Sequence, residues 1–425
     1  MQRLFDISYR FNCDREAVLK KKYNILMLTP DYPPVYGGIG THVYNLCRHL
    51  SSYGCNILVL VARFLGKNSS IDFTNSNFYE YNDNEVTVVE FNTSTDTFLH
   101  GIYEDKTCTQ SEEFFAYSNV NQNYFLLKYI LEYFDSRKIN MEFDLIHMHD
   151  AYHAVVSNVL KKVYNIPLIV TLHSINSGSN SLIDNFRRFS VYNGDLSIFV
   201  SDSLKQKAIE RYSINDTEHF KVVHNGVEIN EEIFTRNTND INQKSTNRIV
   251  FCGRLVSVKG VDILLKAFRM LCEKVEDAQL VIIGDGILKD ELKLLCIQQN
   301  ISDRVVFVGQ LDNIEVRNYF RNSDIVAVPS REEPFGLVAI EAMSEKTCVV
   351  CSNVGGLKEI VKSGYTGMLF ENENYAQLAD VLIELMNNKE LRFSLAENGF
   401  KEANNYSWNK TSEQIFSYYN ELIEK

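Results

Sequence analysis

Two glutamates and a predicted helix start lie close together in residues 330–346. Glu333 and Glu341 are separated by seven residues. The Pro-Phe-Gly string after Glu333 predicts the start of a helix, whose first backbone N–H groups have no partner within the helix. Such N–H groups bind anions. The segment therefore predicts an anion site flanked by two carboxylates, which suits a diphosphate, a ribose diol and a sugar.

Glu341 is the only charged residue in the first two turns after Gly336. A helix that is apolar on all sides is normally buried. A buried carboxylate without a partner is unfavourable, so we expect Glu341 to have one. The alternative is a capped helix with one glutamate that faces solvent.

Two cations share a second predicted loop. Arg254 and Lys259 are five residues apart between Gly253 and Gly260. Both side chains can therefore approach one anion, and the alternative is a pair of surface cations in water. The sequence contains no Asp-X-Asp pair. We expect these cations to neutralise the anion in place of a metal, and we expect no cofactor.

Three histidines, His147, His149 and His153, occur within seven residues. The segment before Asp150 alternates as a strand does, so His147 and His149 share one face. They lie at its carboxyl end, where open α/β sheets bind ligands. A metal is not expected, because no third ligand occurs at a usual spacing. His149 is expected either to contact a ligand or to form a hydrogen bond in the core.

The elements that position these residues begin with a βαβ pattern. Residues 24–29 and 56–62 predict buried strands, with a glycine-rich loop and an amphipathic helix between them. The loop is not GxGxxG, and Arg63 stands where an acidic residue would bind ribose, so NAD binding is not supported. Gly38 either makes a tight turn or allows close approach to a phosphate or sugar.

The second half of the chain repeats this organisation without repeating the sequence. Strands are predicted at 248–252, 280–283, 305–308 and 325–328, and an amphipathic helix follows the loop of Arg254. Residues 64–142 are polar and poorly periodic apart from a predicted helix at 124–134. We expect them to set acceptor specificity, because loops on a rigid scaffold often do.

Several strings resemble one family, the retaining glycosyltransferases of family 4. EPFGLVAIEAM, from Glu333, looks like the E-x7-E signature of that family, and HDAYHA, from His149, resembles the His-Asp-Trp-His-Ala segment of glycogen and starch synthases. Residues 33–54 are similar to the first loop and helix of the family, and residues 225–227 are similar to its interdomain linker. Residues 253–260 are similar to its diphosphate clamp. Residues 344–348 depart from it, because the family usually has a glycine turn and a proline there.

The resemblance implies the GT-B fold, an α/β architecture of two Rossmann-like domains with doubly wound parallel sheets that face each other across a cleft. It implies an acceptor-side domain at 1–225 and a nucleotide-sugar-binding domain at 226–405, with a final helix at 406–425 that packs on the first domain. In this family the counterparts of Glu333 and His149 face the donor sugar, and that of Glu341 holds the ribose.

The composition fits a globular protein, with 45% hydrophobic and 23% charged residues among 425. A net charge of -12 argues against nucleic acid and anionic membranes as partners. No apolar run reaches the roughly 18–20 residues of a membrane span, and the charged N-terminal segment is unlike a secretory signal.

Nine scattered cysteines fit reduced thiols. Cys348 and Cys351 fall on opposite faces of a predicted strand. We expect a cytoplasmic protein.

The expected function is retaining transfer of a hexose from a nucleoside diphosphate sugar to a hydroxyl of a carbohydrate or small polar acceptor. The alternatives are a sugar-nucleotide epimerase of similar fold and an inactive nucleotide-sugar-binding protein. The expected catalytic residues are His149, Arg254, Lys259 and Glu333. The expected donor-binding residues are Gly38, Arg254, Lys259, Glu333, Phe335, Gly336, Leu337 and Glu341.

Overall fold

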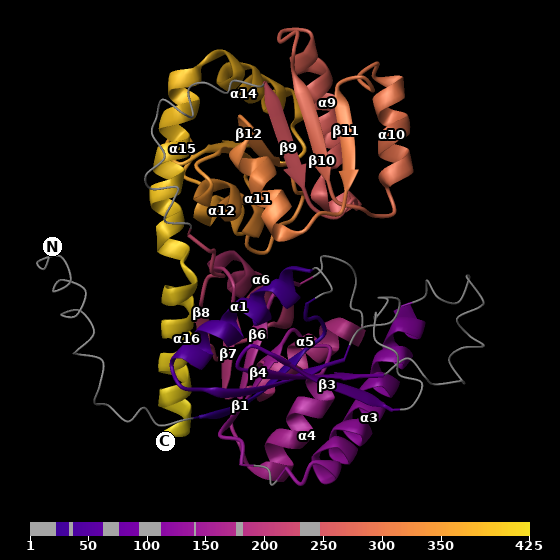
Figure 1. Ribbon diagram of the computed structural model, residues 1–425, viewed down its shortest axis with the longest axis vertical. Coiled ribbons are helices and arrows are strands. Elements are labelled where there is room, and N and C mark those ends of the chain that lie inside the picture. The colour runs from indigo at the N-terminus through magenta and orange to yellow at the C-terminus, as the bar shows by residue number, and fades with distance from the viewer. Residues whose placement is uncertain are drawn as a thin grey trace, which may run out of the picture.

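Two β-sheets, one in each half of the chain, form the frame of the molecule (Figure 1). The computed structural model describes residues 23–33, 37–62, 76–92, 112–139, 142–175, 182–229 and 247–425. Residues 63–75 and 93–111, much of the polar region expected to set acceptor specificity, lie outside these ranges, as do residues 230–246. Within them, no helix combines the length and apolar character needed to cross a bilayer.

The first sheet has eight strands in the order β3-β4-β2-β1-β5-β6-β7-β8. All neighbours are parallel except β3, which is antiparallel to β4. The strands are β1 (Asn24–Thr29), β2 (Asn56–Val61), β3 (Phe78–Asp83), β4 (Val86–Phe91), β5 (Leu145–His149), β6 (Leu168–Leu172), β7 (Leu196–Phe199) and β8 (Phe220–Val222). The sequence did not predict the hairpin of β3 and β4 at the edge of the sheet, because β3 carries polar side chains and has no apolar pattern.

Helices cover both faces of the first sheet. Alternate strand residues such as Leu26 and Met148 pack against one group of helices, and Met27 and Leu145 pack against the other. The first group is α3 (Glu112–Ser136), α4 (Ala154–Tyr164), α5 (Leu182–Asn193) and α6 (Asp202–Tyr212), and the second is α1 (Gly38–Ser52) with α16 (Trp408–Ile423). The helix predicted at 124–134 is the second half of α3.

The second sheet is entirely parallel, with the order β11-β10-β9-β12-β13-β14. Its strands are β9 (Arg248–Cys252), β10 (Gln279–Ile283), β11 (Val305–Gly309), β12 (Ile325–Val328), β13 (Cys348–Ser352) and β14 (Met368–Phe370). Its helices are η1 (Ser257–Lys259), α9 (Val261–Cys272), α10 (Lys289–Gln298), α11 (Asn313–Arg321), α12 (Leu337–Ser344), α13 (Leu357–Ile360), α14 (Tyr375–Asn387) and α15 (Lys389–Ala403). The predicted strands and the α/β class are confirmed.

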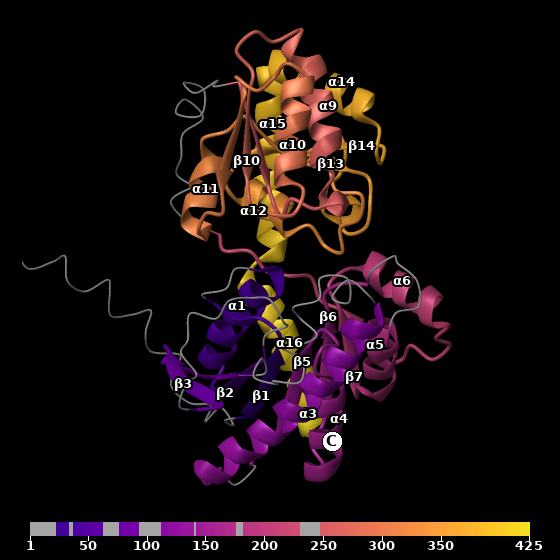
Figure 2. The same ribbon diagram turned by 90° about the vertical axis from the view of Figure 1, so that its right-hand side faces the viewer.

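The C-terminal helices connect the two halves. From α15 the chain passes through η2 (Asn404–Tyr406) into α16, which lies along the first half beside α1 (Figures 1 and 2). The backbone N–H of Val227 donates to the carbonyl of Tyr406 at 2.7 Å. Gly226 is needed beside it, because a methyl group there would lie 2.4 Å from the Trp408 ring. This crossing fixes one edge of the contact between the two halves.

Candidate active site

The loops at the carboxyl ends of the parallel strands bring the predicted residues together. The loop after β1 leads into α1, and the loop after β12 leads into α12, so both helices begin on the facing sides of the two halves (Figure 1). A methyl group on Gly38 would lie 3.7 Å from Cδ1 of Leu337. Two helix N-termini therefore point their free N–H groups into one region, and each favours negative charge there.

The start of α12 is shaped by its glycine. Gly336 is the N-cap residue, with φ at 117°, a conformation that favours glycine. A side chain there would also meet Leu357, since a methyl group would lie 2.7 Å from its Cδ2 atom. Phe335 is buried, whereas Leu337 is partly exposed. The predicted helix start is confirmed, with its first N–H groups at residues 336 and 337.

Glu341 is the fifth residue of α12 and is half-buried. Its carboxylate has no hydrogen-bond or ion-pair partner among the described residues. Its pKa is raised to about 7, chiefly by burial; the charge of Arg317 acts to lower the pKa and that of Glu345 acts to raise it. The predicted partner is thus not a side chain of the described protein, and the carboxylate is available to a ligand.

Glu341 and Lys259 both act on one thiol at the end of β9. Burial raises the pKa of Cys252 to about 12; the charge of Glu341 raises it and that of Lys259 lowers it. Glu341 and Lys259 are 82 positions apart in the sequence, yet both lie within electrostatic reach of Cys252. The fold has therefore brought the β9 loop and α12 together, as the sequence predicted.

Lys259 forms an ion pair that the sequence did not indicate. Its Nζ atom lies 2.7 Å from Oε2 of Glu333, and the Ser330 hydroxyl donates to the same oxygen at 3.0 Å. The β9 loop must pass close to the β12 loop for this contact. Gly260 allows it: its φ is 65°, and a methyl group there would lie 2.0 Å from the carbonyl oxygen of Pro329.

Arg254 is exposed, and its side chain has no hydrogen-bond or ion-pair partner among the described residues. Its charge acts on the phenol of Tyr152, a residue of the first half of the chain. Burial raises the pKa of Tyr152 to about 12, and Arg254 acts to lower it. Arg254 is thus a cation without a partner among these residues, whereas Lys259 is neutralised by Glu333.

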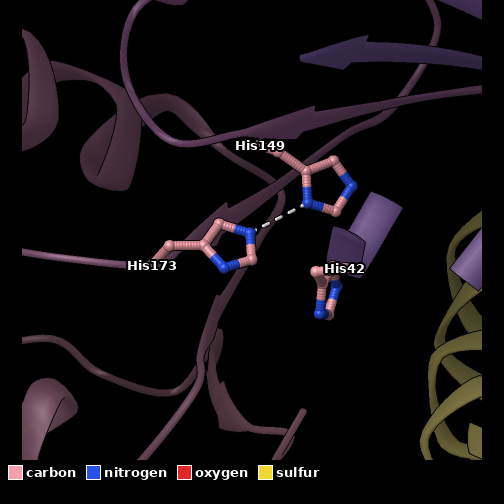
Figure 3. A group of neighbouring side chains, drawn as sticks. All are labelled: His42, His149 and His173. Atoms are coloured by element: carbon pink, nitrogen blue, oxygen red, sulfur yellow. Dashed lines mark hydrogen bonds between the residues drawn. The ribbon is translucent and has the colours of Figure 1, made fainter. Parts of the chain in front are cut away.

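His149 lies in a cluster of histidines rather than at an exposed strand end. It is fully buried, and its Nδ1 atom lies 3.1 Å from Nε2 of His173 (Figure 3). His42 of α1 lies beside both, with ring centroids 5.3 Å from His149 and 4.8 Å from His173. The sequence did not single out His42 or His173, because they come from α1 and the loop after β6.

Burial keeps these imidazoles neutral. It lowers the pKa of His173 to about 3, and it lowers the pKa of His42 and of His149 well below the ordinary value, with neighbouring histidines acting in the same direction. His147 lies two residues before His149 in β5 and has a pKa of about 3. Its ring nitrogens form hydrogen bonds of 2.7 Å each with the hydroxyls of Tyr419 and Thr171. Neutral imidazoles can donate or accept a hydrogen bond but bring no charge.

The cluster has the spacing of a metal site but lacks its usual surroundings. Ring nitrogens of His42, His149 and His173 lie within 4.8 Å of one another. Metal-bound histidines usually donate the other ring N–H to a carboxylate, a carbonyl or water. Here Nε2 of His149 faces the sulfur of Met27 at 3.1 Å. The side chain that interacts with His42 is that of Asn225, an amide and not a carboxylate. These residues do not fit a metal centre well.

A buried ion pair shapes the turn after His149. Asp150 has φ at 60°, and its Oδ1 atom accepts from the N–H of Ala151 at 2.7 Å and from Nε of Arg187 at 3.4 Å. Arg187 is 1% exposed. Removing one partner of a buried pair is strongly destabilising. The pair therefore stabilises the turn that follows β5.

Both halves of the chain match described protein families. Residues 36–231 match the family "Glycosyltransferase Family 4", and residues 234–402 match "Glycosyl transferases group 1". An uncharacterised glycosyltransferase of Methanocaldococcus jannaschii is 32% identical over 401 residues, 92% of this chain and 97% of that protein. A D-inositol 3-phosphate glycosyltransferase of Corynebacterium glutamicum is 29% identical over 314 residues, 68% of this chain and 74% of that protein.

Solved structures share the fold. Sucrose-phosphate synthase from Thermosynechococcus elongatus superposes with a TM-score of 0.76 at 19% identity, over 95% of this chain and 99% of that one. HepE of Anabaena, solved in complex with UDP-glucose, gives a TM-score of 0.67 at 19% identity, over 94% of this chain and 100% of that one. The likeness shows the two-domain GT-B architecture.

Proposed function

This chain belongs to glycosyltransferase family 4, and we propose that it transfers a hexose to a hydroxyl of a carbohydrate or other small polar acceptor. Family membership makes it a retaining glycosyltransferase with a nucleoside diphosphate sugar as donor. The identity of the sugar, the acceptor and the residue roles below are the proposal. Its main support is the pair of facing helix starts near a cation, Arg254, and a carboxylate, Glu341, neither of which has a side-chain partner in the described part of the chain.

The diphosphate is proposed to bind between the starts of α1 and α12. The N–H groups at Gly336 and Leu337, and the backbone at Gly38, would donate to its oxygens. Arg254 would add a charge-assisted contact, because it has no competing partner among the described residues. Negative charge grows on the diphosphate as the glycosidic bond breaks. Preorganised donors of this kind stabilise such charge without a metal ion.

The ribose is proposed to bind Glu341. An ionised carboxylate accepts hydrogen bonds only, and a vicinal diol offers two donors. The half-buried position makes such bonds stronger than they would be in water. Phe335, buried directly before the start of α12, is also proposed to take part in donor binding.

The donor sugar is proposed to lie between Glu333 and the histidine cluster. Glu333 would orient the sugar hydroxyls, with Lys259 and Ser330 holding its carboxylate. When the diphosphate enters, Lys259 can also turn towards it, because a lysine side chain is flexible. His149 is fully buried, so its contact with the sugar requires entry of the sugar beside His173, which is 9% exposed.

The acceptor is proposed to be polyhydroxylated and to bind on the first-domain side. D-inositol 3-phosphate, which appears in the name of the C. glutamicum relative, belongs in the first panel of acceptors. Glucans, oligosaccharides and amino-sugar compounds complete it. A cytoplasmic location remains part of the proposal, supported by free thiols at all seven described cysteines.

A two-stage assay tests this function. Labelled UDP-, ADP- and GDP-hexoses are first screened for slow hydrolysis, and the active donor is then offered to the acceptor panel. We expect release of the nucleoside diphosphate and a product with the anomeric configuration of the donor. Conversion of one nucleotide sugar into its epimer without an acceptor would support an epimerase instead. Tight donor binding with no turnover on any acceptor would support an inactive binding protein.

A further inference from the structure

We propose that Glu359 is a positioning residue for sugar transfer: it joins the N-terminus of α6 in the first domain to the loop at 330–336 in the second. We call this loop the donor loop, since it contains Glu333 and ends at the start of α12. No known motif of the sequence pointed to Glu359. Its role in catalysis rests on the function proposed above, whereas the contact itself does not.

The contact is a carboxylate bound to a helix N-terminus. Glu359, on α13, accepts hydrogen bonds from the backbone N–H of Asp202 at 3.0 Å and of Ser203 at 2.7 Å. Both N–H groups belong to the first turn of α6, an 11-residue helix, where they have no partner within the helix. The negative charge also faces the positive end of the helix dipole. One side chain of the second domain thus caps a helix of the first.

The charged form of Glu359 is favoured where it lies. Burial acts to raise its pKa, but His224 and the two N–H groups of α6 outweigh this effect and lower the pKa below its ordinary value. The Nε2 atom of His224 lies 3.6 Å from the carboxylate. Glu359 is 19% exposed, so water screens these contacts less than it would at the surface.

The same helix start also touches the donor loop directly. Ser201, the N-cap residue of α6, donates its hydroxyl to the carbonyl of Pro334 at 2.5 Å. One turn further on, Nζ of Lys207 lies 2.9 Å from the Glu332 carboxylate. Pro334 and Glu332 are the two neighbours of Glu333. The first domain therefore contacts the donor loop on both sides of its proposed catalytic carboxylate.

Glu359 and Glu333 are connected within the second domain. The N–H of Gly356 donates to the carbonyl of Glu333 at 2.9 Å. Gly355 has φ at 49°, and a methyl group there would lie 2.0 Å from the same carbonyl oxygen. Phe335 stacks on His224, with ring centroids 5.8 Å apart. The segment from Gly355 to Glu359 is thus packed onto the donor loop, so the position of one determines that of the other.

These contacts predict that replacing Glu359 changes the turnover of sugar transfer but not the affinity for the nucleotide. The proposed nucleotide contacts are made by Arg254, Glu341 and the start of α12, all in the second domain. Loss of Glu359 leaves them in place but weakens the attachment of the donor loop to α6, to which Ser201 and Lys207 also contribute. A misplacement of about 1 Å at a reacting group can cost on the order of 100-fold in rate. The variant should therefore lose kcat while it retains nucleotide affinity.

The test compares Glu359→Ala, Glu359→Gln and the control Lys358→Ala, an exposed neighbour on the same helix. Each is measured for kcat, KM, nucleotide Kd by calorimetry, and hydrogen exchange at the first-turn amides of α6. For Glu359→Ala we expect at least a tenfold lower kcat, a Kd within twofold of the wild type, and faster exchange at Asp202 and Ser203. Glu359→Gln should recover part of kcat, because its amide oxygen can accept one of the two bonds.

Two results would overturn the proposal. In the first, exchange at α6 accelerates but kcat is unchanged, which would make the contact irrelevant to transfer. In the second, kcat per folded molecule is unchanged and only the melting temperature falls, which would leave a structural role alone. A wild-type protein that transfers no sugar would instead refute the proposed function, and this role with it. The Lys358→Ala control should match the wild type in every measurement.

Discussion

The ammonium group of Lys259 lies 2.7 Å from the carboxylate of Glu333, so two residues with separate expected roles neutralise each other in the unliganded protein. The donor would enter a site where Arg254 has no partner among the described residues and Lys259 is paired with Glu333. Glu333 in turn is held by Lys259 and Ser330 before any sugar arrives. Such preorganisation lowers the cost of ordering side chains during the reaction.

Because of this ion pair, we expect Lys259 and Glu333 to act as a unit. Lys259→Ala should lower kcat by about 100- to 1000-fold, as expected for loss of a group that faces developing charge. Combining it with Glu333→Gln should cost less than the sum of the single changes, since each already disrupts the pair. Steady-state kinetics of the double-mutant cycle measure this. Lys266→Ala, which removes a surface lysine of α9, is the control. Full additivity would show that the pair has no role in transfer.

The function of Arg254 should depend more strongly on side-chain geometry than that of Lys259. We expect Arg254→Ala to lower kcat by about two to three decades and Arg254→Lys to recover only part of it, because an ammonium lacks the planar pair of donors. Transfer by the wild type should continue in excess EDTA. Activity that is lost in EDTA and restored by magnesium, with Arg254→Ala nearly unaffected, would contradict the proposed phosphate site.

Glu341 is expected to hold the ribose. Glu341→Ala should weaken nucleotide binding by about 1.5–3 kcal/mol, the usual range for hydrogen bonds to a charged group. The fold should remain intact, because the carboxylate has no partner among the described residues to leave behind. Isothermal titration with the nucleoside diphosphate measures the change. An unchanged Kd would place the ribose elsewhere.

The raised pKa of Glu341 also predicts a pH dependence. Its pKa is about 7 in the folded, unliganded protein, against 4.5 ordinarily. Ribose hydroxyls that donate to the carboxylate favour its ionised form, so donor binding should release a proton. Affinity for the nucleotide sugar should therefore rise between about pH 5 and pH 7 and level off above that. Titrations in buffers of different ionisation enthalpy detect the proton, and Glu341→Gln should abolish its release.

The raised pKa of Glu341 also makes the stability of the unliganded protein depend on pH, and here the protonated form is the favourable one. The folded protein binds the Glu341 proton more tightly than the unfolded chain does. The free energy of unfolding contributed by this group therefore falls as pH rises from 4.5 to about 7. Without ligand, Glu341→Gln should melt at a higher temperature than the wild type at pH 8 and at nearly the same temperature at pH 4.5. A lower melting temperature at pH 8 would refute this account.

Replacement of His149 should lower turnover, whereas replacement of His147 should lower stability. His149→Ala is expected to lower turnover at least about tenfold and leave nucleotide affinity unchanged. His147 bonds Tyr419 and Thr171 in the core, so His147→Ala should mainly reduce stability. Neither imidazole should titrate between pH 5 and pH 8, because burial keeps both neutral. Kinetics, thermal melts and NMR of the ring protons separate these outcomes. Wild-type kcat in His149→Ala would remove it from the site.

The sequence by itself determined the order of strands and helices and the position of the helix start beside Glu333. Both are local properties: strand burial follows from apolar runs, and the start of α12 follows from Pro334, Phe335 and Gly336. The CxxC string also behaved as predicted, since Cys348 and Cys351 lie within β13. The hairpin β3–β4 was missed, because an edge strand with polar side chains has no apolar pattern.

Only the tertiary structure decided which distant residues meet. The histidine cluster draws His42, His149 and His173 from three different elements, and the Lys259–Glu333 pair joins two loops 74 positions apart. Glu359 meets the start of α6 across 156 or more positions of sequence. Local periodicity cannot report such contacts. The first two depend on which loops lie side by side within one half of the chain, and the third depends on how the two halves face each other.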